Sequence, residues 1–208
     1  MANFIVIGTW NTKYEELEFI CKEIKKRSHH PIRLDLSSKK MAGARDVAIS
    51  HKILLAKTRL KQMVKKGHLS GAISIGGGTN LFMATKIMED IPLFVPKVII
   101  STMIVNSIHS FRTYKDIVYI QSPFDFGIFN PLTESILTNG VTILTSMSEG
   151  LPNFDNPSIA ITGFGISDGY FEVAKNFWRK NGYHLVPFHS VGESTMAMAE
   201  LIQKGFFK

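Results

Sequence analysis

VIGTWNTKYEEL, residues 6–17, changes from an apolar strand to a charged helix within a few residues. The apolar run Phe4–Ile7 is typical of a strand that is buried on both faces. Apolar residues then recur at helical spacing between Leu17 and Ile24. The polar turn between the strand and the helix either holds a ligand or merely caps the helix, with Thr12 and Glu15 as a capping box.

Strand and helix signals alternate along the rest of the chain. Further strands are expected at 32–36, 71–75, 97–102, 116–122, 159–165 (with its turn) and 184–188. Further helices are expected at 53–64, 79–90, 131–147, 171–180 and 196–204, the third with Asn130 as N-cap before Pro131. Strands separated by helices predict an α/β fold, with a parallel sheet covered by helices on both faces.

The segment EGLPNFDNP, residues 149–157, has the composition of a linker. It predicts a first domain at 1–148 and a second α/β domain that begins at 157 and is only partial at 208. The second part has two strands and two helices, too few for an independently stable sheet. It leans on the first domain, pairs with another chain, or is a truncated piece.

The composition is that of a globular protein, with 45% hydrophobic and 20% charged residues. Cys21 is the single cysteine, so no internal disulfide can form, and a reducing compartment is expected. Cys21 lies on an apolar helical face and is expected in the core. The N-terminus does not resemble a signal peptide, and no apolar run approaches the roughly 20 residues that span a membrane. We therefore expect a cytoplasmic protein without membrane contact.

Positive charge is concentrated in residues 1–70, which hold 15 Lys and Arg against 6 Asp and Glu. A basic half is compatible with nucleic-acid binding. Most of these residues, however, interleave with apolar ones at helical spacing, as on a solvated helix face. No zinc-finger spacing or aromatic RNA-binding motif accompanies them, so a nucleic-acid partner is not expected.

Ligands of open parallel sheets bind beyond the carboxyl ends of the strands. Four such ends carry polar or glycine-rich turns: Gly8–Lys13, Gly76–Asn80, Ser101–Thr102 with the following Asn106 and Ser107, and Gly163–Gly169. The turn Gly76–Asn80, GGGTN, is the strongest signal, because its glycines let backbone approach a ligand and the following helix N-terminus suits phosphate. Its alternative is a tight turn with an N-cap. Lys13 would add a cation, with Ser101, Thr102 or Asp116 nearby.

Several other chemistries are not supported by the sequence. No segment fits the P-loop pattern G-x-x-x-x-G-K-S/T. GFGISDG, residues 163–169, misses the dinucleotide pattern by one residue, and no acidic residue ends the following strand. No histidine or cysteine cluster predicts a metal, and no residue has a defensible role as catalytic base or nucleophile.

The motifs VIGTWNTKYEELEFI, ISIGGGTNLFMATKIMEDIP, VPKVIISTM and the segment from IAITGFGISDG onward occur in one order. In these motifs and their order the chain resembles an uncharacterised two-domain family that includes the tomato mosaic virus resistance proteins of plants and is described as having an ATP-binding domain. The resemblance covers most of the chain. It implies a pair of Rossmann-like domains, with ATP at strand ends of the first.

By position, the resemblance implies nucleotide-binding residues in the first domain and residues that line a cleft in the second. The first set is Gly8, Thr9, Asn11, Thr12, Lys13, Gly76, Gly77, Gly78, Thr79, Asn80, Ser101 and Thr102. The second set is Gly163, Gly165 and His189.

The chain departs from the family pattern at three places. Asn11 replaces an aspartate, which weakens the case for magnesium. Leu81 replaces a threonine of the glycine loop, and Glu193 introduces a negative charge that repels phosphate in the second domain. The family also runs to roughly twice this length, so the resemblance implies a second domain that is cut short.

The leading hypothesis is thus a nucleotide-binding protein with ATP as ligand. The alternative is a degenerate member that acts as a protein-interaction or self-association module, as a homo-oligomer or with a protein partner. A third possibility is an enzyme for a small anionic metabolite, with the cleft between the domains as its active site.

Overall fold

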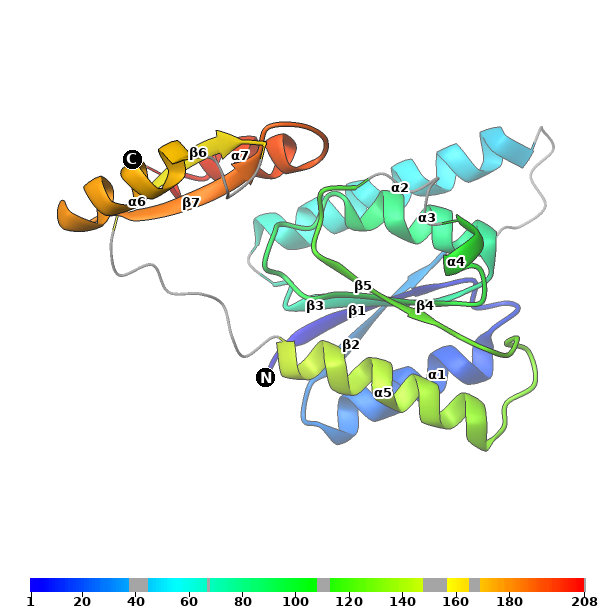
Figure 1. Cartoon of the computed structure of the whole chain (residues 1–208). Helices are drawn as coiled ribbons and strands as arrows, with labels where there is room; N and C mark the ends of the chain where they lie inside the picture. The colour runs from blue at the N-terminus through cyan, green and yellow to red at the C-terminus, as the bar shows by residue number, and fades with distance from the viewer. Residues whose placement is uncertain (38–44, 67, 108–112, 148–156, 165–168, 208) are drawn as a thin grey trace. The chain divides into compact units, whose positions relative to one another are not determined.

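The computed structural model describes residues 1–37, 45–66, 68–107, 113–147, 157–164 and 169–207 (Figure 1). The chain forms two compact units. Unit 1 is residues 1–151 except 112–114, and unit 2 is 152–208 with 112–114. Of the predicted linker, 149–157, only Pro157 belongs to the described residues, and the rest lies outside them.

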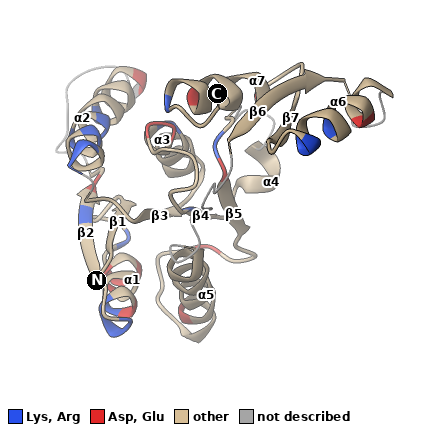
Figure 2. Cartoon of the chain, turned by 90° about the vertical axis from the view of Figure 1, so that its left-hand side faces the viewer, with Lys and Arg blue, Asp and Glu red and all other residues tan. Residues whose placement is uncertain are grey.

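Unit 1 is a five-stranded parallel sheet between two layers of helices, which confirms the predicted fold class. Its elements are β1 (Asn3–Gly8), α1 (Tyr14–Lys26), β2 (His30–Asp35), α2 (Arg45–Lys65), β3 (Gly71–Gly76), α3 (Gly78–Met88), β4 (Lys97–Ser101), α4 (Ile104–Ser107), β5 (Ile117–Gln121) and α5 (Pro131–Met147). The strand order is β2-β1-β3-β4-β5, and Figure 2 shows this order with α1 and α5 on one face and α2 and α3 on the other.

Each face of the sheet has its own apolar core. Strands β3 and β4 are buried along their whole length, because helices cover both of their faces. On one side Leu17 and Ile20 of α1 pack with Leu137 and Val141 of α5. On the other side the buried residues of α3 pack with those of α2 and of β1. The helical spacing seen in the sequence therefore marks the faces that lie on the sheet.

Some elements differ from the sequence prediction. Helix α2 begins at Arg45 rather than at residue 53, and the one-turn helix α4 was not predicted. A helical pattern in the sequence needs apolar residues that recur on one buried face. In the early part of α2 the apolar Val47 is exposed, so the pattern does not appear there. Most of its lysines are exposed or half-buried, as on a solvated face (Figure 2). None of the helices in the described ranges is long and apolar enough to cross a membrane.

Gly140 lets α5 lie close to the sheet. A Cβ atom at this position would lie 2.5 Å from Cδ1 of Ile100, which is fully buried. In an exposed helix, Gly→Ala gains about 1 kcal/mol, but overpacking a core costs about 1–3 kcal/mol. We expect Gly140→Ala to lower the free energy of unfolding by about 1 kcal/mol. Denaturant unfolding measures this, with the exposed neighbour Asn139→Ala as control. A more stable Gly140→Ala variant would contradict the close packing.

Unit 2 contains two parallel strands and two helices. Its elements are β6 (Ser158–Gly163), α6 (Gly169–Lys180), β7 (His184–His189) and α7 (Ser194–Gln203). After α7 the chain returns to β6, where Phe207 forms a parallel bridge with Ser158. The order β7, β6, Phe207 repeats the order β2, β1, β3 of unit 1. In unit 2, β6 therefore has β7 on one side and the bridge to Phe207 on the other, and the partial second domain stays a prediction.

Candidate functional site

The carboxyl ends of β1, β3, β4 and β5 lie at one edge of the sheet, because all neighbouring strands are parallel. The strand order reverses between β1 and β3, and their helices leave toward opposite faces of the sheet. Ligands of open α/β sheets bind at such a switch point. The two turns singled out in the sequence, Gly8–Lys13 and Gly76–Asn80, flank it.

The Gly76–Asn80 turn is held by the side chain of Asn80. Its Nδ2 donates to Ser74 Oγ at 2.9 Å and to the carbonyl oxygen of Ile75 at 2.7 Å. Ser74 Oγ in turn donates to the carbonyl oxygen of Ile7 at 3.0 Å, which ties β3 to β1. Gly76 has φ +152°, and a Cβ there would lie 2.7 Å from Cβ of Asn80. The first glycine is therefore required by the turn itself.

Asn80 also carries an unsatisfied acceptor. The residue is 5% exposed, and its Oδ1 has no hydrogen-bond partner among the described residues. Buried polar atoms in native structures are almost always paired with protein or ordered water. This oxygen, in the first turn of α3, can accept a hydrogen bond from a water or a ligand.

Gly77 is the N-cap of α3 and has a different role from Gly76. Its backbone is extended, with φ −83° and ψ −167°, and as a glycine it makes no side-chain cap hydrogen bond. A Cβ at this position would meet nothing within 4 Å, so the space beside it is open. The first turn holds no acidic residue, and its amides have no acceptor inside the helix. These are the properties of an anion-binding helix N-terminus.

In the other turn, Gly8 is a packing glycine, because a Cβ there would lie 2.7 Å from the methyl groups of Leu17. The carbonyl oxygen of Thr9 accepts from the amides of Thr12 and Lys13, both at 3.0 Å. The hydroxyls of Thr9 and Thr12 share a hydrogen bond of 2.9 Å. The turn is thus closed by its own groups.

The predicted capping box of Thr12 and Glu15 is wrong. The N-cap of α1 is Lys13, and it makes no side-chain cap hydrogen bond. The reason is the turn from Thr9, which engages the amide of Thr12 and moves the start of the helix to Tyr14. The polar residues of this stretch therefore do not cap α1.

Two residues that sequence reasoning missed anchor this turn to the end of β2. Asp35 Oδ1 accepts from the amides of Trp10, at 3.2 Å, and Ser37, at 2.8 Å. Ser37 Oγ accepts from the amide of Asn11 at 2.9 Å. Burial raises the pKa of Asp35, but the hydrogen bonds from Ser37 and Trp10 outweigh it, so the net pKa lies below its ordinary value. Asp35 is therefore a charged anchor for the loop.

The ammonium group of Lys13 lies at the turn between β5 and α5. Its Nζ donates to the carbonyl oxygen of Phe126 and lies 3.4 Å from the position of a Cβ on Gly127, which has φ +135°. The structure does not join Lys13 to the Gly76–Asn80 turn. Its role as a phosphate partner stays a prediction.

Ser101 and Thr102 follow β4 beside the glycine turn. Ser101 pairs in register with Gly76 and is fully buried, and its Oγ accepts from the amide of Met103 at 3.2 Å. Thr102 is half-buried, and its carbonyl oxygen accepts from Gln121 Nε2 at 2.9 Å. Both residues lie at the predicted edge, with Ser101 engaged in its own turn.

The expectation that Asp116 lies near the site is wrong. Asp116 precedes β5 and therefore lies at the amino edge of the sheet, opposite the glycine turn. Its carboxylate forms an ion pair of 2.7 Å with Lys97, the fully buried first residue of β4. Asp116 therefore stabilises the fold by pairing with Lys97 and is not part of the candidate site.

In unit 2, Gly163 and His189 pair in register at the carboxyl ends of β6 and β7. Gly163 is a packing glycine, since a Cβ there would collide with Tyr170 and Phe171 of α6. The amide of His189 donates to Ser194 Oγ at 3.0 Å. Gly165 lies outside the described residues. The predicted cleft role of these residues stays a prediction.

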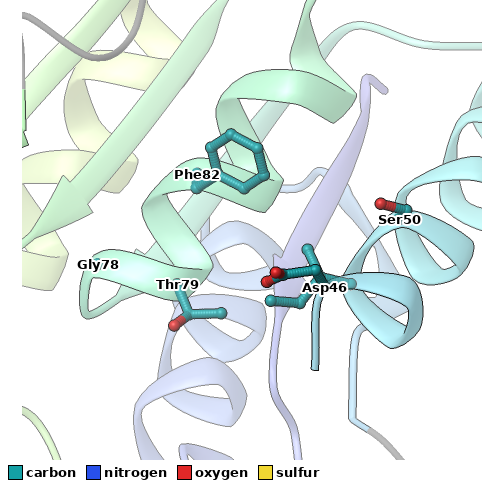
Figure 3. Close-up of a pocket in the computed structure, with 6 residues that line it drawn as sticks. Asp46, Ser50, Gly78, Thr79 and Phe82 are labelled. Atoms are coloured by element: carbon teal, nitrogen blue, oxygen red, sulfur yellow. The ribbon is translucent and has the colours of Figure 1, made fainter. Parts of the chain in front are cut away.

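A pocket of about 470 Å³ opens beside the glycine turn, between the first turns of α2 and α3. It is lined by Asp46, Ile49, Ser50, Gly78, Thr79 and Phe82. Figure 3 shows Asp46 and Ser50 on the α2 side, with Thr79 and Phe82 on the α3 side. Sequence reasoning missed the α2 wall, because nothing in the sequence brings the start of this helix to α3.

Metal and thiol chemistry find no support at this edge. Within the described ranges, no group of three or more His, Cys, Asp or Glu is placed to hold a metal ion. Cys21 is buried in the core of unit 1, as predicted, and burial together with Glu18 raises the pKa of its thiol. The thiol is therefore neutral and inaccessible.

Comparison with known proteins gives the family. Among related sequences, a UPF0261 protein of Clostridium tetani is 28% identical over 98% of this chain and 57% of its own length. A UPF0261 protein of Rhizobium meliloti is 24% identical over 99% of this chain, again 57% of its own length. The chain thus spans just over half the length of these relatives.

The tomato relatives match in part. The ToMV susceptible protein tm-1(GCR26) of Solanum lycopersicum is 28% identical over 78% of this chain but only 22% of its own length. Residues 39–152 match the N-terminal domain of the uncharacterised protein family UPF0261. This match covers more than half of the chain, and the chain therefore belongs to the UPF0261 family.

Proposed function

We propose that this chain binds a phosphorylated small molecule, with ATP as the candidate, at the carboxyl edge of the unit 1 sheet. The phosphate lies at the first turn of α3, beside Gly77. The observation that carries the proposal is an acid-free helix N-terminus that begins at an open N-cap glycine, at the point where the strand order reverses.

A cation at this edge also supports an anionic ligand. Lys13 supplies a positive charge at the same edge, where its ammonium donates to the carbonyl oxygen of Phe126. Exchange of that carbonyl for a phosphate oxygen would give a charge-assisted hydrogen bond, which is roughly twice as strong.

ATP is preferred to other phosphates because the family resemblance implies it. Magnesium has no evident protein ligand in the β1–α1 turn, because Asn11 stands where the family pattern has an aspartate. We therefore propose that binding does not require the metal. No reaction is assigned.

Thermal unfolding with and without ATP tests this proposal. A ligand at 100 times its dissociation constant adds about 2.7 kcal/mol, which raises the midpoint of a chain this size by about 5–10 °C. We expect such a shift with or without magnesium, and a smaller one for Lys13→Ala. The absence of any shift would favour the alternative, a protein-interaction or self-association module.

A further inference from the structure

The pocket between α2 and α3 has walls of unlike chemistry. The ring of Phe82 is 40% exposed and, with Ile49, gives an apolar surface. Asp46 in the first turn of α2 and the hydroxyls of Ser50 and Thr79 give polar groups around it (Figure 3). A cavity of 300–1,000 Å³ with apolar walls and a few placed polar groups is the usual form of a small-molecule site.

The carboxylate of Asp46 restricts what the pocket accepts. A carboxylate repels phosphate and accepts hydrogen bonds from hydroxyl or amino groups. The phosphate end of a ligand would therefore stay at Gly77 and Gly78, and the pocket would take an uncharged part that carries such donors. Phe82 lies four residues after Gly78, about 6 Å along the helix axis. A flat, apolar group joined to the phosphate by a linker of about that length would contact the ring of Phe82.

We propose that this pocket receives the nucleoside part of a nucleotide, with the base against Phe82 and the ribose hydroxyls donating to Asp46. This inference rests on the proposed function, since it needs the phosphates at the first turn of α3. It assigns nucleotide selectivity to the start of α2, a segment that carries none of the residues singled out in the sequence. Phosphate without a nucleoside would bind without contacts to Phe82 or Asp46.

Calorimetric titration of the 208-residue chain with ATP and with inorganic tripolyphosphate separates nucleoside binding in the pocket from phosphate binding at the first turn of α3. Phe82→Ala should weaken ATP binding by about fivefold or more, the effect of removing an aromatic partner from a base, and leave tripolyphosphate binding unchanged. Asp46→Ala should weaken ATP binding and tighten tripolyphosphate binding, because it removes both an acceptor and a negative charge. The control is Leu132→Ala, an exposed truncation in α5 on the opposite face of the sheet.

Other results would contradict either the nucleoside pocket or the proposed function itself. If both variants bind ATP as the wild type does, or lose ATP and tripolyphosphate equally, the pocket does not receive a nucleoside, although the phosphate site stands. If the wild-type chain binds neither probe, the proposed function fails, and the inference fails with it. Circular dichroism of each variant establishes that the fold is retained.

Discussion

Gly77→Asp is expected to lose ATP binding while keeping the stability of the wild-type chain. Aspartate is a favoured N-cap, the backbone of Gly77 is open to any residue, and a Cβ there meets nothing within 4 Å. The new carboxylate would lie near the bound phosphate. At about 4 Å two like charges repel by roughly 1 kcal/mol in water and 4 kcal/mol near a protein surface. We expect the dissociation constant for ATP to rise by about 100-fold.

Gly77→Asn is the matched control, because asparagine caps a helix equally well and carries no charge. It should keep most of the affinity measured by calorimetric titration, and both variants should unfold at or slightly above the wild-type temperature. Equal ATP affinity of the aspartate and asparagine variants would show that phosphate does not bind beside this residue.

Asp116→Ala is expected to destabilise unit 1 and to leave the affinity for ATP unchanged. Its carboxylate faces the ammonium of Lys97, which is 0% exposed, and it also accepts from the amide of Phe94 at 2.9 Å. Breaking a buried pair costs about 3–5 kcal/mol, but Asp116 is 37% exposed, so we expect a loss of about 2–3 kcal/mol. Denaturant unfolding followed by the fluorescence of Trp10, in a Trp178→Phe background, measures this loss in unit 1.

The double variant Asp116→Ala/Lys97→Met separates the lost charge pair from lost packing. Methionine leaves no unpaired buried charge, so it should recover at least half of the loss. Lys61→Ala, which removes the exposed partner of Asp90 in unit 1, should cost no more than about 0.5 kcal/mol. A single variant as stable as the wild type would contradict a structural role for Asp116.

The edge that carries the candidate site could be predicted because parallel strands end together. Apolar runs before Gly8, Gly76 and Ser101 define three strands, and helices between them make the strands parallel. The residues after each run then meet at one edge whatever the strand order. Asp116 was misplaced because it begins a strand, and the same argument puts it at the opposite edge.

Side-chain packing could not be predicted, because it depends on tertiary distances. Gly8, Gly140 and Gly163 read as turn signals or weak points in the sequence, yet each makes room for a neighbouring side chain. The anchoring of the first turn by Asp35 and Ser37 follows from the pairing of β1 with β2. The pocket wall formed by α2 likewise requires two helices to meet, which no local pattern encodes.

The central claim, that phosphate binds at the first turn of α3, is tested most directly by amide chemical shifts. A ¹⁵N-labelled chain titrated with ATP should show its largest shift changes at the amides of Gly77, Gly78 and Thr79, which begin this helix. Saturation of those changes would also give the dissociation constant. If those amides stay in place while ATP saturates the protein, the ligand binds elsewhere and the account is wrong.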